Sequence, residues 1–86
     1  MKSMIDELTE KLGQFLDYYD LSYTIDEATW IPTLIFISRN NGEKYTFKLQ
    51  TEEIRDFLDG ELPIRISDML NVLIMEMRNS KINELI

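Results

Sequence analysis

The sequence predicts an α+β domain in which a three-stranded antiparallel meander carries helices packed mainly on one face. Three observations lead to this class: a helical apolar repeat opens the chain, an alternating repeat follows it, and a helical repeat returns at the end. The expected order is therefore α-β-β-β-α-α. With 86 residues, of which 44% are hydrophobic, the chain has room for one core, so residues 1–86 are expected to form a single domain.

The first helix is expected to run from Met4 to Tyr19, because apolar residues recur every three or four positions between them. Ser3 and Asp6 have the spacing of a capping box at its start. Gly13 interrupts the pattern at a cost in helix stability, and we expect another part of the chain to pack closely against it.

Three segments with strand character follow. The middle one is apolar on both faces, with Leu34 and Phe36 on one and Ile35 and Ile37 on the other, as is typical of a central strand. The turn Asn40-Asn41-Gly42 then favours a hairpin, since these residues tolerate positive φ angles. The expected strands are Leu21 to Ile25, Thr33 to Ser38 and Lys44 to Gln50.

Two helices are expected to close the chain. Thr51 is expected to cap a short helix that ends before Gly60, and Ser67 is expected to cap the last helix beyond Pro63. Phe36 and Leu73 are therefore predicted to meet in one core cluster. The inward set of the last helix is expected to be Met69, Leu70, Leu73, Ile74 and Met77, continued by Ile82, Leu85 and Ile86.

Charge and composition exclude several classes of function. The chain has 9 basic and 16 acidic residues, a net charge of −7 and a sequence pI of about 4.4, which disfavours direct binding to a phosphate backbone. It contains no histidine and no cysteine, so the usual general bases, nucleophiles and nitrogen or sulfur metal ligands are missing. We expect a protein that is not an enzyme, that uses no cofactor or metal, and whose charged partners are basic.

Two aromatic positions have competing interpretations. Trp30 precedes a predicted strand; a single Trp in so small a domain favours a core position, and an exposed interface anchor is the alternative. Tyr18 and Tyr19 end the first predicted helix, and we expect one of them to pack in the core with the other exposed.

The length, acidity and element order resemble those of the small type II-A anti-CRISPR proteins, which are phage-encoded inhibitors of RNA-guided nucleases. The similarity in residues is confined to the hairpin and the following helix. It is carried by Thr33-Leu34-Ile35-Phe36-Ile37, by Asn40-Asn41-Gly42-Glu43-Lys44-Tyr45, and by Ile54 and Phe57.

The resemblance implies that the protein is a DNA mimic, whose carboxylates occupy the nuclease surface that reads a short duplex motif beside the target. By position, Asn41 and Glu43 match the hairpin loop of that family, and Asp59 and Glu61 match the loop between the last two helices. Lys44 departs from the family, which favours an acid there, and the loop between the helices is shorter and less acidic. These departures imply a different nuclease target or another acidic-inhibitor role.

The sequence thus predicts an acidic inhibitor of a basic nucleic-acid-binding protein, and the resemblance implies that this partner is a CRISPR nuclease. We expect it in the cytoplasm, of a bacterial host cell if it is phage-encoded, with no membrane contact. The alternative is a structural or regulatory module that self-associates weakly. Its contacts would be a sheet face exposing Ile35 or Ile37 and the apolar tail Ile82, Leu85 and Ile86. The predicted partner-binding residues are Asn41, Glu43, Asp56, Asp59 and Glu61.

Overall fold

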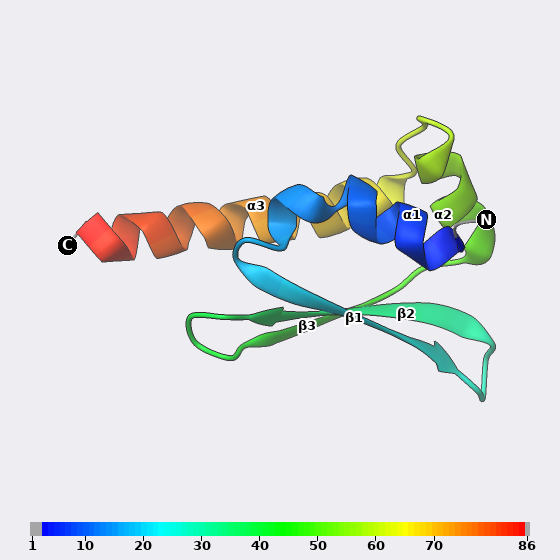
Figure 1. Cartoon of the computed structure of the whole chain (residues 1–86), viewed down its shortest axis with the longest axis horizontal. Helices are drawn as coiled ribbons and strands as arrows, with labels where there is room; N and C mark the ends of the chain where they lie inside the picture. Colours follow the sequence, from blue (N-terminus) through cyan, green and yellow to red (C-terminus); the bar gives the residue numbers. More distant parts are fainter. Residues whose placement is uncertain (1–2, 86) are drawn as a thin grey trace.

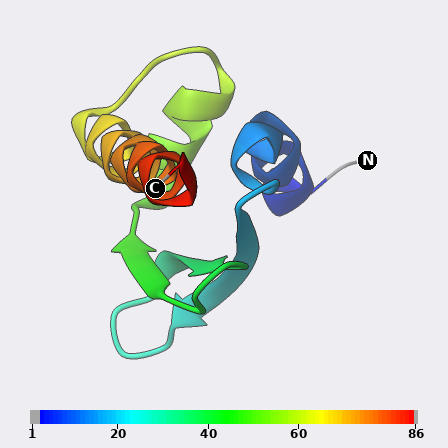
Figure 2. The same cartoon turned by 90° about the vertical axis from the view of Figure 1, so that its left-hand side faces the viewer.

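The computed structural model describes the backbone of residues 3–85 and the side chains of residues 3–79. Its helices lie on one side of a three-stranded antiparallel sheet of order β1-β2-β3, and the other sheet face carries no described helix (Figures 1 and 2). This confirms the predicted α+β class and element order. The elements are α1 (Met4–Lys11), a 3₁₀ turn η1 (Gly13–Phe15), β1 (Tyr19–Asp26), β2 (Ile31–Ser38), β3 (Lys44–Lys48), α2 (Thr51–Leu58) and α3 (Ile64–Leu85).

Strand β2 is the central strand, as predicted, and its two faces have different roles. Leu34 lies between Tyr23 of β1 and Phe47 of β3 on the face that the helices cover. Ile35, on the opposite face, lies between Ser22 and Thr46. Because directly opposed residues of an antiparallel pair point to the same side, this register gives the sheet one apolar, aromatic-rich face and one mixed face.

The core lies between the sheet and the helices. Phe36 and Leu73 are both fully buried in one cluster, which confirms their predicted meeting. Tyr19 packs edge-on against Phe36, with ring centroids 6.3 Å apart, and Phe36 packs against Phe47 at 6.1 Å. The cluster consists of Leu8, Leu12, Phe15, Tyr19, Leu34, Phe36, Leu49, Ile54, Phe57, Ile66, Met69 and Leu73.

The first helix is shorter than predicted. Its start is confirmed, because Ser3 Oγ accepts from the Asp6 N–H at 3.2 Å and Asp6 accepts from the Ser3 N–H at 3.4 Å. The helix ends at Lys11, however, and Tyr19 is buried from the first position of β1. The prediction of close packing at Gly13 was wrong, since a Cβ added there would meet nothing within 4 Å. Gly13 instead begins the 3₁₀ turn through which the chain leaves the helix.

Helix α2 is capped one residue earlier than predicted. Gln50, not Thr51, is the N-cap, and its N–H donates to Glu53 Oε1 at 3.2 Å. The C-terminal end agrees with the prediction: Gly60 has a φ of +104°, which an L-residue rarely adopts. The N–H groups of Gly60 and Glu61 donate to the carbonyls of Phe57 and Asp56, a Schellman arrangement that closes the helix.

Helix α3 begins earlier than predicted. It starts at Ile64, so the assignment of Ser67 as N-cap was wrong, and the Ser67 N–H donates at 2.9 Å to the Pro63 carbonyl inside the first turn. Proline suits a helix start because its missing N–H would have no partner there. The early start brings Ile66 into the core, where it is fully buried. No helix in the described residues is long and apolar enough to cross a membrane.

The inward face of α3 is largely as predicted. Met69 and Leu73 are buried, and Leu70 and Met77 pack against the core. Ile74 departs from the prediction, because it lies among the exposed large hydrophobic residues of the protein. The predicted continuation through Ile82, Leu85 and Ile86 falls outside the described side chains.

The prediction that Trp30 packs in the core was wrong. Its side chain is 78% exposed, and its φ of 55° lies in the left-handed region, which is unusual for a bulky residue. It is the last residue of the four-residue turn between β1 and β2. Asp26 organises this turn by accepting from the Ala28 N–H at 3.0 Å, and Ile31 resumes the pairing. The turn that contains Trp30 lies at the rim of the sheet, on the side away from the helices (Figure 1).

Candidate protein-binding surface

The five predicted partner-binding residues do not form one site. Asn41 and Glu43 lie in the loop between β2 and β3, on the side of the molecule toward which the C-terminal turns of α3 extend (Figure 1). Asp56, Asp59 and Glu61 lie on α2 and in the loop after it, toward the other end (Figure 1). The structure therefore separates the two groups that the resemblance would combine in a single surface.

The hairpin group takes part in the structure of its own loop. Gly42 adopts a φ of +74°, and the Asn41 side chain accepts from the Glu43 N–H at 2.9 Å. The Tyr45 hydroxyl donates to Glu43 Oε2 at 2.6 Å. This hydrogen bond, together with burial and the nearby Glu76 of α3, raises the pKa of Tyr45. Tyr45 therefore remains a neutral donor between two carboxylates that come from different elements.

The second group is held by the end of α2. The Schellman bonds at Gly60 use only backbone atoms, so the side chains of Asp56, Asp59 and Glu61 are left exposed to solvent. Asp59 lies beside α1, where it shares a shallow groove with Glu7 and Glu10. We define the α1–α2 acidic surface by the groove carboxylates Glu7, Glu10 and Asp59 together with Asp56 and Glu61, which are exposed at the same end of α2.

One basic side chain, Lys11, lines the same groove and bonds to the other helix. Lys11 Nζ donates to the Phe57 carbonyl and lies 4.5 Å from the centroid of the Phe57 ring. Lys11 thereby joins α1 to the end of α2. Arg55 lines a neighbouring hollow together with Glu7 and Asp59. Among the described residues that line these two hollows, three acidic side chains thus accompany two basic ones.

Sequence reasoning missed Glu7 and Glu10 as members of this surface. Their spacing of three residues could have predicted that they share one face of the first helix. The sequence could not predict which element lies beside that face. Only the packing of α1 against α2 brings both carboxylates beside Asp59.

A second exposed feature is apolar. Trp30 and Ile25, which is 50% exposed, line a shallow hollow at the β1–β2 turn together with Tyr23, Thr24 and Glu27. Sequence analysis considered an exposed Trp30 only as the alternative. A glycine in this turn would have indicated a positive φ angle. Ala28 and Thr29 precede Trp30 instead, so the sequence did not indicate that Trp30 itself adopts one.

The described residues contain no group of three or more carboxylates placed to hold a metal ion. Comparisons with protein-family models, curated proteins and solved structures found no match. The resemblance to the anti-CRISPR proteins therefore stays a prediction. What the fold and surface define is a small α+β protein with an acidic pair of helices.

Proposed function

We propose that the protein is a non-catalytic inhibitor that binds a basic nucleic-acid-binding protein and covers its DNA-binding surface. The observation that carries this proposal is the convergence of carboxylates from α1 and α2 on one surface. A nucleic-acid-binding groove is lined with lysine and arginine, so an acidic surface can compete there with phosphates. The net charge of −7 would also speed the encounter of the two proteins.

A CRISPR RNA-guided nuclease is the specific target that we propose, on the basis of the resemblance. In this proposal the contact is made by the α1–α2 acidic surface. Asn41 and Glu43 lie toward the opposite end of the molecule, so they would contact the nuclease only if it also extended over the hairpin loop. Because the two groups lie apart, reversing charges on the α1–α2 acidic surface alone tests whether that surface binds the nuclease.

Reversing Asp59 and Glu61 together to lysine should abolish or strongly weaken inhibition without unfolding the protein. Both side chains are exposed and the helix end is closed by backbone bonds, so stability should change by no more than about 0.5 kcal/mol. The measurement is competition: labelled duplex bound to the candidate nuclease is titrated with each protein. Inhibition by the unmodified protein should also weaken as salt rises from about 0.05 to 0.5 M.

The matched control reverses Asp17 and Glu27, which are exposed and lie outside the α1–α2 acidic surface. This variant has the same net charge as the first, so equal losses in both would mean that only overall charge matters. Failure of the unmodified protein to displace duplex from any nuclease in a panel would refute the proposed function.

Self-association is the second candidate function, and the uncovered sheet face favours it. Ile35 and Ile37 lie half-buried on this face. The same face has an acidic edge along β1, with Asp20 and Asp26, and a basic edge along β3, with Lys44 and Lys48. Within one copy, Asp26 pairs with Lys48 at 3.0 Å and Asp20 pairs with Arg39 at 2.8 Å, so a dimer would exchange or extend these pairs. A two-fold axis parallel to the strands would place the acidic edge of one copy over the basic edge of the other, in an aligned face-to-face packing.

This candidate predicts a weak homodimer that Ile35→Lys or Ile37→Lys converts to a monomer, because a buried lysine without a partner is costly. Sedimentation equilibrium over increasing protein concentration measures it. A monomer at millimolar concentration would remove the candidate.

A further inference from the structure

Strand β3 is an edge strand whose outer side has free pairing groups. In an antiparallel pair, every second residue directs its backbone N–H and C=O to the neighbouring strand. The Leu49 N–H donates to the Pro32 carbonyl and the Ser38 N–H donates to the Glu43 carbonyl, so the odd-numbered residues from 43 to 49 face β2. By that alternation, the backbone groups of Tyr45 and Phe47 point toward β2, and those of Lys44, Thr46 and Lys48 point outward. Among the described residues, no backbone bond outside the regular elements involves these outward groups.

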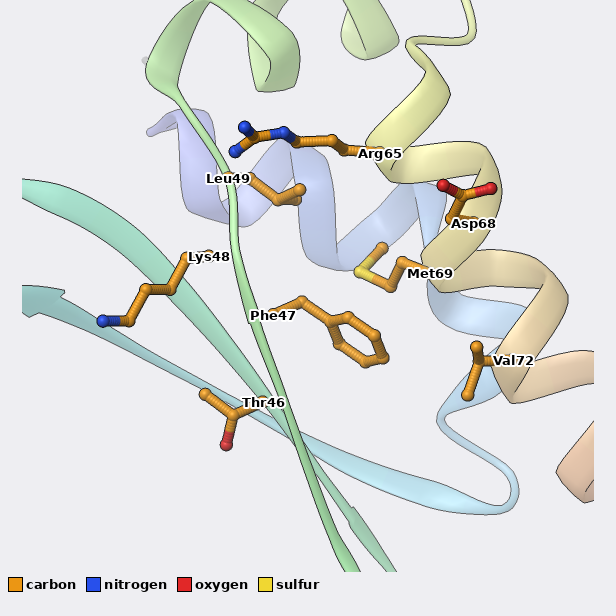
Figure 3. A pocket seen from close by; sticks show the side chains of 8 residues that line it. All are labelled: Thr46, Phe47, Lys48, Leu49, Arg65, Asp68, Met69 and Val72. Atoms are coloured by element: carbon orange, nitrogen blue, oxygen red, sulfur yellow. The ribbon is translucent and has the colours of Figure 1, made fainter.

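A groove runs beside this edge, between β3 and α3. It has a volume of about 270 Å³ and an apolar floor formed by Phe47, Leu49 and Met69. Figure 3 shows the Phe47 ring and the Met69 side chain between the two elements, with Val72 on the α3 side. Val72 is 40% exposed although it lies beside the core. The groove therefore offers apolar contact beside unpaired backbone, which is the combination that strand addition requires.

The charge around β3 is opposite to that of the rest of the protein. Residues 31–50 contain three basic residues and one acidic residue, whereas the whole chain is strongly acidic. Lys44 and Lys48 point to the uncovered sheet face, and Lys48 pairs there with Asp26 at 3.0 Å. On the helix side, the groove rim carries Arg65, which pairs with Glu53 at 3.9 Å, and the acidic Asp68. An added strand would thus have Lys44 and the Asp26-paired Lys48 on one side and the apolar groove on the other.

We propose that an extended peptide segment of a partner protein adds to the outer edge of β3, alternating apolar and acidic residues. Its apolar side chains enter the groove beside Phe47 and Val72, and its carboxylates face Lys44 and Lys48 across the strands. Pairing of β3 with β3 of a second copy would set like charges against each other, as edge lysines commonly do to prevent such pairing. This site is separate from the α1–α2 acidic surface and takes a partner of opposite charge.

The test uses a fluorescein-labelled seven-residue peptide, blocked at both ends, that alternates glutamate with valine and phenylalanine. Binding is measured by fluorescence anisotropy and mapped by amide shifts of the ¹⁵N-labelled protein. Thr46→Pro should weaken binding at least about tenfold, because it removes a central outward donor and adds a ring at the edge. It removes no bond to β2, and edge strands tolerate proline with its nitrogen outward. Thr46→Val, which keeps the N–H, should bind as the unmodified protein does.

Two further comparisons isolate the features that the proposal names. Val72→Glu, at the groove, should weaken binding, whereas Met75→Glu, exposed on the same helix outside the groove, should not. A peptide methylated on the backbone nitrogens that would face β3 should not bind, and this comparison decides the question even if Thr46→Pro fails to fold. Neither Thr46→Pro nor Val72→Glu should change competition with duplex on a nuclease, so the two proposals can fail independently.

Equal affinity of the methylated and unmethylated peptides, or shifts confined to residues away from β3 and α3, would overturn the proposal. Binding of a scrambled peptide of the same composition with equal affinity would do so too. A third contrary result is that the protein oligomerises at the concentrations of the titration and Thr46→Pro prevents it. In that case the occupant of the edge is a second copy, whose β1 strand also alternates apolar and polar residues.

Discussion

Replacing Phe36 with alanine is expected to lower the free energy of unfolding by about 3–5 kcal/mol. Phe36 is fully buried on the central strand, where its ring meets Tyr19 from β1 and Phe47 from β3. Alanine would leave a cavity at the point where the sheet meets the helices. A domain of this size has a net stability of roughly 5–10 kcal/mol, so the loss is a large part of the total.

Urea unfolding followed by far-ultraviolet circular dichroism measures the effect. Phe36→Leu serves as the control, since it keeps most of the apolar volume and should cost less than the alanine variant. A loss below about 1 kcal/mol for Phe36→Ala would contradict the burial of this side chain.

Replacing Ile66 with alanine is expected to cost about 2–5 kcal/mol, the second largest effect. Ile66 is fully buried in the first turn of α3 because the helix begins directly after Pro63. Ile64, two residues earlier, is 81% exposed and makes a matched control. Ile64→Ala should change stability by no more than about 0.5 kcal/mol.

The same unfolding measurement distinguishes the two possible starts of α3. With a start at Ser67, the Ser67 side chain would cap the first N–H groups of the helix. Ser67→Ala would then cost roughly 0.5–2 kcal/mol as the loss of an N-cap. With the start at Ile64, we expect no such loss from Ser67→Ala, because its N–H already bonds to Pro63 inside the helix.

The sheet was predictable because each strand carries its own signal. Alternation in β1 and β3, apolar residues on both faces of β2, and the turn at Asn41-Gly42 all depend on local spacing. The burial of Leu34 and Phe36 followed directly from the position of β2 between its neighbours. In this part of the chain, local preference and tertiary structure agree.

The errors arose where two local patterns overlap or where no local pattern exists. Tyr19 fits the helical repeat before it and the strand alternation after it, and only packing against Phe36 assigns it to the strand. Ser67 is a good cap by residue type, but Pro63 begins the helix earlier. Trp30 was expected inside because tryptophan is large and apolar, and nothing in its neighbours showed that the β1–β2 turn extends beyond the helices.

The candidate surface was predictable in composition but not in arrangement. Asp59 and Glu61 were predicted from their match to the loop between the last two helices, and both are exposed in the structure. Whether they lie beside α1 depends on how α1 and α2 pack. That packing is set jointly by many apolar residues between the two helices, so no local pattern predicts it. For the same reason, the sequence could not show that Glu43 lies at the other end of the molecule.

The exposure of Trp30 determines what the tryptophan fluorescence of this protein can measure. Trp30 is the single tryptophan of the chain, and 78% of its side chain is exposed to solvent in the native fold. Its indole is therefore surrounded by water both before and after denaturation, so its emission wavelength should hardly move as the core melts. A molecule that covers the β1–β2 turn would remove that water and shift the emission to shorter wavelength. The intrinsic fluorescence of this protein is thus a label-free sensor of contact at one end of the sheet rather than of folding.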